Sequence, residues 1–120
     1  MKNRIGAVAR LCGALCVFVG AGVAGAAPVD TARLNNAADE PGNWMTHGGT
    51  YQEQRFSRLD QIDQDNVADL GLAWSVRLDI DRGVEATPIV VDGVMYTTSA
   101  FSIVYAFDAK TGELLWKYDP

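Results

Sequence analysis

Cysteine and histidine are nearly absent from this chain. Its two cysteines, Cys12 and Cys16, lie within the first 26 of 120 residues. The remaining residues therefore support neither a disulfide nor thiol chemistry. The single histidine, His47, has no cysteine or second histidine at ligand spacing, so we expect a surface or hydrogen-bonded loop residue and no metal site there.

Long apolar runs are also scarce. Residues 11–23 are apolar and uncharged, but they are too few to span a bilayer comfortably. Three basic residues precede this run, and Ala24-Gly25-Ala26 follows it as a small-x-small cleavage pattern. We therefore predict that residues 1–26 are a secretory signal peptide cleaved after Ala26, rather than a membrane anchor.

Positive charge is scarce in residues 27–120. All fifteen acidic residues lie there with only seven of the ten basic ones, which gives a formal charge of −8. Such a surface is a poor partner for nucleic acid or anionic lipid. Together with the export signal, it predicts a soluble periplasmic protein without a stable membrane span.

Residues 27–71 are predicted to form an N-terminal arm with short helical turns. Asp30 or Thr31 caps the first turn, and Asn66 caps a second that ends at a left-handed Gly71. The aspartates between positions 60 and 69 lack the loop glycine and terminal glutamate of an EF-hand, so we interpret them as a solvated face with a helix cap. Further predictions assign Trp44 and Trp74 to packing, and Arg55 to bonding carbonyls or a carboxylate.

Residues 72–120 have an all-β pattern. Four strands are expected at 87–91, 94–98, 103–108 and 113–118. Asp92-Gly93 is a two-residue hairpin turn, and Gly112 suits a positive φ in the last turn. Four short antiparallel strands in this span are typical of one β-propeller blade, which cannot cover both of its own faces.

A partial repeat extends the pattern towards the N-terminus. Residues 71–75 (GLAWS) resemble residues 112–117 (GELLWK), and the two tryptophans are 42 positions apart, near the period of a blade. We therefore expect a strand at 72–80, with Leu72, Trp74 and alternate residues on one face. It would be the outer strand of a neighbouring blade, which in a closed propeller is often the last one, completed by the N-terminal strand.

Several short motifs follow one another through residues 30–120. They are WMTHG at 44–48, QRFS at 54–57, LDQI at 59–62, NV at 66–67, LGLAW at 70–74, RGVEATP at 82–88, VDGVMY at 91–96 and AFDAKTGELLW at 106–116. In this order they resemble the N-terminal part of the pyrroloquinoline quinone (PQQ)-dependent alcohol dehydrogenases. TTSA at 97–100 favours the ethanol-type or quinohaemoprotein branch, although Arg58 and Phe101 replace residues that are often Pro and Trp in this family.

The resemblance implies an eight-bladed propeller that oxidises a small alcohol and passes electrons to a cytochrome c-type acceptor. It implies PQQ near the axis and a calcium or lanthanide ion beside it, and it allows a haem c in a downstream domain. The metal ligands, vicinal cysteines, aspartate base and stacking tryptophan of the family would follow residue 120. We therefore expect an incomplete domain, with no catalytic or metal-binding residue in this chain and no activity of this part alone.

Glu85 is the one residue that matches a cofactor contact of the family. It precedes the innermost strand, where its carboxylate would point into the central funnel and contact PQQ. By composition alone, a solvated loop glutamate is the alternative interpretation.

Two other functions remain open from the sequence. One is a non-enzymatic periplasmic propeller scaffold with the same tryptophan motif, but such a scaffold needs neither the arm at 44–73 nor the Glu85 loop. The other is a small binding module that works alone. A single sheet with two apolar faces argues against that module, since nothing covers it.

Overall fold

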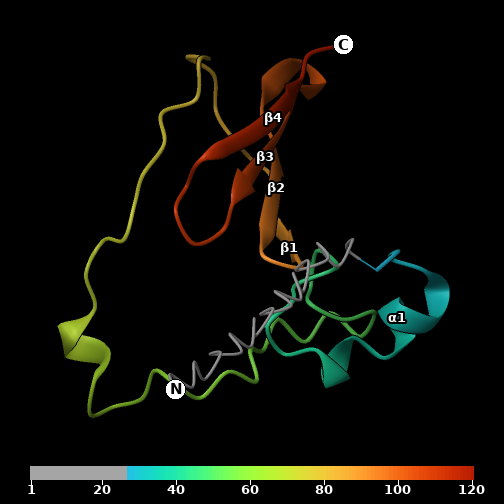
Figure 1. Ribbon diagram of the computed structural model, residues 1–120, viewed down its shortest axis with the longest axis vertical. Coiled ribbons are helices and arrows are strands. Elements are labelled where there is room, and N and C mark those ends of the chain that lie inside the picture. The colour runs from blue at the N-terminus through green and yellow to red at the C-terminus, as the bar shows by residue number, and fades with distance from the viewer. Residues whose placement is uncertain (1–26) are drawn as a thin grey trace, which may run out of the picture.

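The protein combines one small sheet with a long, loosely wound arm (Figure 1). The computed structural model describes residues 27–120, so the predicted signal peptide at 1–26 lies outside the described residues. Within the described part, no helix is long and apolar enough to cross a membrane.

The sheet is a four-stranded antiparallel meander. Its strands are β1 (Ile89–Val91), β2 (Val94–Thr98), β3 (Val104–Asp108) and β4 (Leu114–Tyr118), in spatial order β1-β2-β3-β4. Asp92 and Gly93 both have positive φ, 50° and 80°, as a two-residue turn that suits the twist of a hairpin requires. The four expected strands and the first turn are confirmed, with bounds that differ by at most two residues.

The turn between β3 and β4 is organised by one carboxylate. Asp108 Oδ1 accepts hydrogen bonds from the backbone N–H of Lys110 at 2.9 Å, and from the N–H and hydroxyl of Thr111 at 2.7 and 2.9 Å. These bonds, chiefly those from Thr111, lower the pKa of Asp108. Gly112 completes the turn with a φ of 74°, as its sequence position predicts.

The strand expected at 72–80 is not formed within residues 27–120, because no backbone ladder forms there. The segment is extended, but a strand needs a hydrogen-bonded neighbour, and the described residues provide none. Side chains attach it to one face of the sheet instead. The small core between them contains buried Ile103, Tyr105 and Phe107, with Leu78, Ile80 and Met95 packed against them.

The opposite face of the sheet is open. Tyr96, Ala106 and Trp116 share one row across β2, β3 and β4, and the Tyr96 and Trp116 rings lie 5.9 Å apart. Trp116 and Tyr118 remain 46% and 58% exposed. The sheet therefore leaves this face uncovered at β4, as expected for a single blade.

The arm begins with helix α1 (Thr31–Asn35), which Asp30 caps by accepting the Arg33 N–H at 2.8 Å. Three short 3-10 turns follow along the chain: η1 (Ala37–Asp39), η2 (Val67–Asp69) and η3 (Ala100–Ser102). The predicted Asn66 cap and left-handed Gly71 at η2 are wrong. The Asn66 side chain makes no cap bond, and η2 ends at an extended Leu70.

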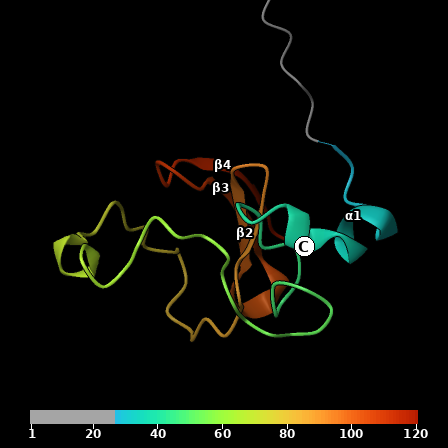
Figure 2. The ribbon, with the colours of Figure 1, turned by 90° about the horizontal axis from the view of Figure 1, so that it is seen from below.

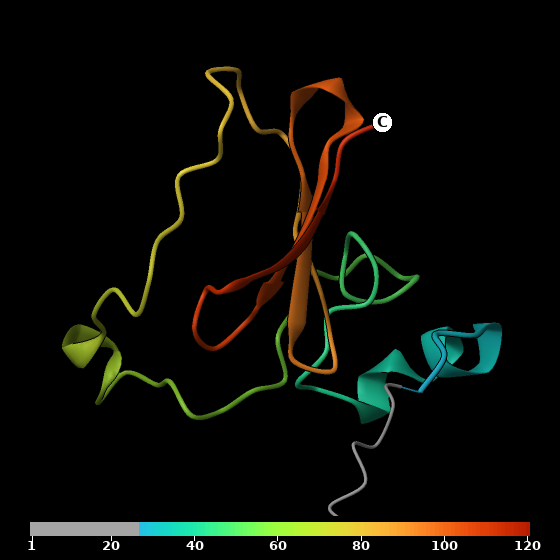
Figure 3. The ribbon, with the colours of Figure 1, turned by 45° about the horizontal axis from the view of Figure 1, so that its top comes forward.

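The arm reaches the sheet through Trp44. The backbone N–H of Trp44 donates to the Val90 carbonyl at 2.7 Å, and the Val90 N–H donates to the Trp44 carbonyl at 3.0 Å. These two bonds form an isolated antiparallel bridge on β1. From there residues 51–72 travel away from the sheet and return, with η2 on the side opposite α1 (Figures 2 and 3).

Candidate functional site

Glu85 lies where two loops converge. Because β1 and β2 are antiparallel, the loop before β1 and the loop after β2 meet at the same end of the sheet. They border an open hollow lined by Arg82, Gly83, Glu85, Ala86, Thr98, Ser99 and Ala100. Glu85 is exposed there, and no described residue hydrogen-bonds its carboxylate. The carboxylate is thus accessible to a ligand.

A cation–π contact joins the two loops at the rim of this hollow. The guanidinium carbon of Arg82 lies 5.7 Å from the centre of the Phe101 ring. Phe101 has a φ of 63° and is 69% exposed, so the backbone of η3 turns the ring outward. The hollow therefore offers one carboxylate, one guanidinium and the hydroxyls of Thr98 and Ser99 to a polar ligand.

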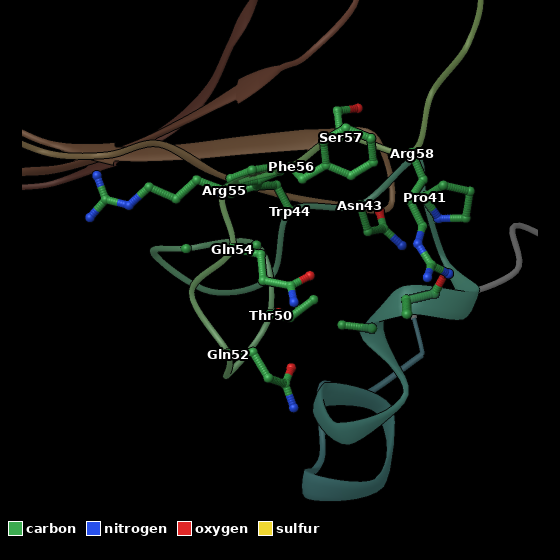
Figure 4. Close-up of a pocket in the computed structure, with 14 residues that line it drawn as sticks. Pro41, Asn43, Trp44, Thr50, Gln52, Gln54, Arg55, Phe56, Ser57 and Arg58 are labelled. Atoms are coloured by element: carbon green, nitrogen blue, oxygen red, sulfur yellow. The ribbon is translucent and has the colours of Figure 1, made fainter.

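A second hollow, of about 220 Å³, lies within the arm (Figure 4). Thr50, Gln52 and Gln54 line one side of it, and Trp44 lies near Phe56 on another. Its charged residues, Arg55 and Arg58, are both cationic, and Arg58 donates to the Ala38 carbonyl at 3.2 Å. Without a carboxylate it is not the site predicted at Glu85, and it has no proton-transfer group.

His47 is half-exposed in the arm, as expected. Arg55 Nη2 lies 3.4 Å from His47 Nδ1, and Glu53 Oε2 lies 3.7 Å from the same nitrogen. The prediction that Arg55 bonds carbonyls or a carboxylate is wrong, since its guanidinium meets the imidazole. Among residues 27–120, no three His, Cys, Asp or Glu side chains gather as metal ligands.

The sequence did not reveal a charge cluster around Arg33. The Arg33 guanidinium, whose side chain is 12% exposed, donates to both oxygens of Glu40 and of Asp92. These bonds hold the pKa of both carboxyls below the usual range and raise that of Arg33. The cluster ties α1 to the β1–β2 turn, 59 positions away.

A second unpredicted cluster attaches residues 72–80 to the sheet. The hydroxyl of Tyr105, a residue only 3% exposed, donates to Asp79 Oδ1 at 2.7 Å, and Lys117 Nζ donates to Oδ2 at 2.7 Å. The bond from Lys117, followed by that from Tyr105, lowers the pKa of Asp79 to about 2. Neither cluster has a local sequence signal, because its members come from distant segments.

Trp44 and Trp74 are packing residues, as predicted. The Trp44 ring packs on Gly49, and its indole N–H donates to the His47 carbonyl at 3.3 Å. The Trp74 ring packs on Gly112, and its N–H donates to the Ala109 carbonyl at 3.2 Å. Both indoles therefore stabilise turns, and Trp44 also borders the hollow within the arm.

Comparison with known proteins identifies clear relatives. Residues 44–120 match the family model for the β-propeller domain of PQQ-dependent glucose, ethanol and alcohol dehydrogenases. The quinohemoprotein alcohol dehydrogenase ADH-IIG of Pseudomonas putida is 67% identical over 94 residues, which cover 78% of this chain and 13% of the relative. The quinohemoprotein alcohol dehydrogenase of Comamonas testosteroni is 58% identical over 85 residues, or 71% and 12% of the two chains.

Solved structures agree. The structure of ADH-IIG superposes with a TM-score of 0.76 at 67% identity, covering 79% of this chain and 14% of that one. The Comamonas testosteroni enzyme superposes with a TM-score of 0.70 at 55% identity, covering 77% and 14%. The chain thus spans about one seventh of the length of these relatives.

Proposed function

This chain belongs to the family of PQQ-dependent alcohol dehydrogenases, in its quinohaemoprotein or ethanol-type branch, and on that premise we propose that it is the opening part of a periplasmic alcohol dehydrogenase. The proposed enzyme oxidises primary alcohols to aldehydes and passes electrons to a cytochrome c-type acceptor. Bound PQQ would accept the hydride, with a calcium or lanthanide ion as Lewis acid. The high identity to two quinohemoprotein alcohol dehydrogenases supports this proposal.

Glu85 is the residue of this chain that we assign to cofactor binding. Its exposed carboxylate borders the hollow between the two loops at one end of the sheet. A ligand with several carboxylates and a ring N–H fits this donor set, because Glu85 can accept from the N–H or share a proton with a carboxylate. Arg82 supplies a positive charge at the same hollow.

The segment at 72–80 has a proposed structural role. It is extended, has no ladder partner among the described residues, and packs on the sheet through Trp74, Leu78 and Ile80. This placement supports its assignment as the outer strand of a second blade, whose other strands come from elsewhere in a longer chain. Pairing there would satisfy its free backbone groups.

A hybrid enzyme tests the function. Residues 27–120 would replace the matching part of ADH-IIG, and the hybrid would be assayed for PQQ binding and dye-coupled ethanol oxidation. We expect an active hybrid, weaker PQQ binding for Glu85→Ala, and unchanged binding for Glu113→Gln, which alters an exposed turn glutamate. A folded hybrid that binds PQQ equally with either variant would contradict the Glu85 assignment, and a folded but inactive hybrid would contradict the function.

Export is tested separately. If the proposed signal peptide is cleaved after Ala26, the mature protein recovered from the periplasm will begin at Ala27. N-terminal mass spectrometry measures this directly. Recovery from the cytoplasm with Met1 intact would oppose the proposed localisation.

A further inference from the structure

The tip of the arm is a short element held together by its own hydrogen bonds. We call residues 61–70, which contain η2, the knob. Asp63 Oδ1 accepts the Asn66 N–H at 3.1 Å, and Asn66 Oδ1 accepts the Asp63 N–H at 3.0 Å. The Asn66 amide also donates to the Gln61 carbonyl at 3.0 Å, and the Val67 N–H donates to the Asp63 carbonyl at 3.0 Å. Reciprocal bonds of this kind define one backbone conformation.

In the knob, polar side chains bond internally and apolar side chains are exposed. Asp63 and Asn66 use their polar groups internally, whereas Ile62, Val67 and Leu70 are 58%, 51% and 59% exposed. Single exposed apolar residues are ordinary, but three on one bonded ten-residue element are not. A defined backbone that directs apolar side chains outward is typical of an interface.

Exposed acidic residues accompany this apolar group. Asp65 and Asp69 belong to the knob and Asp60 directly precedes it, and no described residue forms an ion pair with them. An apolar centre with a charged rim is the usual anatomy of a protein interface. The complementary surface is therefore apolar with basic residues at its margin.

All three ribbon views place the knob on the side of the sheet opposite α1, and no described segment covers it (Figures 1–3). The solved ADH-IIG structure matches 79% of this chain, which is about as many residues as the range 27–120 contains. That structure is of a protein about seven times longer than this part. The arm extends far from the sheet, and this is compatible with packing against the rest of a longer propeller, which this chain does not contain.

We propose that the knob docks on the body of the same propeller, against an apolar patch with basic margins, and so fastens the arm. This inference rests on the proposed function, because the body belongs to the longer enzyme. It adds an interface role for Ile62, Val67 and Leu70.

The hybrid with ADH-IIG provides the test. The variant I62D/V67D/L70D puts charge into the proposed interface, and we expect it to shorten the half-life of the folded hybrid on heating by about tenfold. The matched variant I62V/V67I/L70M keeps the apolar character and should behave as the parent. Gln64→Asp adds charge to the knob without removing an apolar group, so it should also be tolerated.

Labelling probes the contact between the knob and the body directly and complements the half-life measurement. In the folded hybrid, hydroxyl-radical labelling of Ile62 and Leu70 should be several-fold slower than their exposed fractions of 58% and 59% predict. Labelling at the rate that those fractions predict, or equal half-lives for the aspartate and apolar variants, would overturn the docking. If residues 27–120 instead form a dimer that the aspartate variant dissociates, the occupant is a second copy and the proposal is wrong.

The two proposals fail in distinguishable ways. An inactive hybrid with protected knob residues opposes the enzymatic function and supports the docking. An active hybrid with freely labelled knob residues supports the function and opposes the docking.

Discussion

Gly112 lies directly against the indole of Trp74, and a Cβ on residue 112 would come within 2.6 Å of the ring. The same indole donates its N–H to the Ala109 carbonyl at 3.2 Å. The β3–β4 turn and residues 72–80 are therefore packed together at a point where only glycine fits. The contact explains why this turn glycine lies beside a tryptophan 38 positions earlier.

Replacing this glycine should test the contact. Gly112→Ala combines a positive-φ penalty of roughly 1 kcal/mol with a clash against Trp74. Gly93→Ala is the matched control, since Gly93 also has positive φ but nothing within 4 Å of a Cβ. We expect Gly112→Ala to lower the free energy of unfolding of the hybrid in urea by about 1–3 kcal/mol more than Gly93→Ala does. Equal losses would show that Trp74 gives way easily.

The Arg33 cluster should stabilise the attachment of α1 to the sheet. Arg33→Met leaves Glu40 and Asp92 close together without their shared cation, so the arm should detach more readily. Arg77→Met is the control, because the Arg77–Asp81 pair is 90% and 96% exposed. Limited proteolysis near residue 30 measures the effect. Equal cleavage rates for the two variants would exclude a fastening role for Arg33.

Acid should weaken the attachment of residues 72–80 through Asp79. Its pKa falls from the usual 3.8 to about 2 in the folded protein. A carboxyl with a lowered folded pKa contributes stability that is present above pH 3.8 and lost as the pH falls towards 2. Asp79→Asn should therefore flatten the stability–pH curve of the hybrid in this window. Asp81→Asn, at an exposed neighbour, should leave the curve unchanged.

Residues 27–120 alone should be poorly folded and inactive. One sheet face is open, with Trp116 46% exposed, and the core contains few residues. We expect no cooperative thermal transition at monomer size by circular dichroism. Dye-coupled ethanol oxidation after addition of PQQ and calcium should also be absent. A sharp monomeric transition or measurable oxidation would each contradict one half of this prediction.

Local chemistry explains which features were predictable. Asp92-Gly93 and Asp108-Thr111-Gly112 determine their turns through nearby hydrogen bonds and positive φ, so the strands on either side of them were located to within two residues. The alternation at 72–80 predicted extended backbone but could not supply a ladder partner. At η2, the Asn66 side chain does not cap the turn, because its Oδ1 accepts the upstream Asp63 N–H instead.

For the candidate site, the sequence identified Glu85 and the loop that contains it. It did not reveal that Thr98 and Ser99 border the same hollow, or that Arg82 stacks on Phe101. Those relations follow from the antiparallel return of β2 beside β1, which brings separate loops to one end of the sheet.

The sequence by itself determined the blade, its turns and the family, because these depend on residues that are neighbours along the chain. Only the tertiary structure decided that Arg33 meets Asp92, that Asp79 meets Tyr105, and that Trp74 covers Gly112. Such contacts depend on the path of the chain between distant segments. The local sequence is compatible with many such paths, and tertiary packing selects one of them.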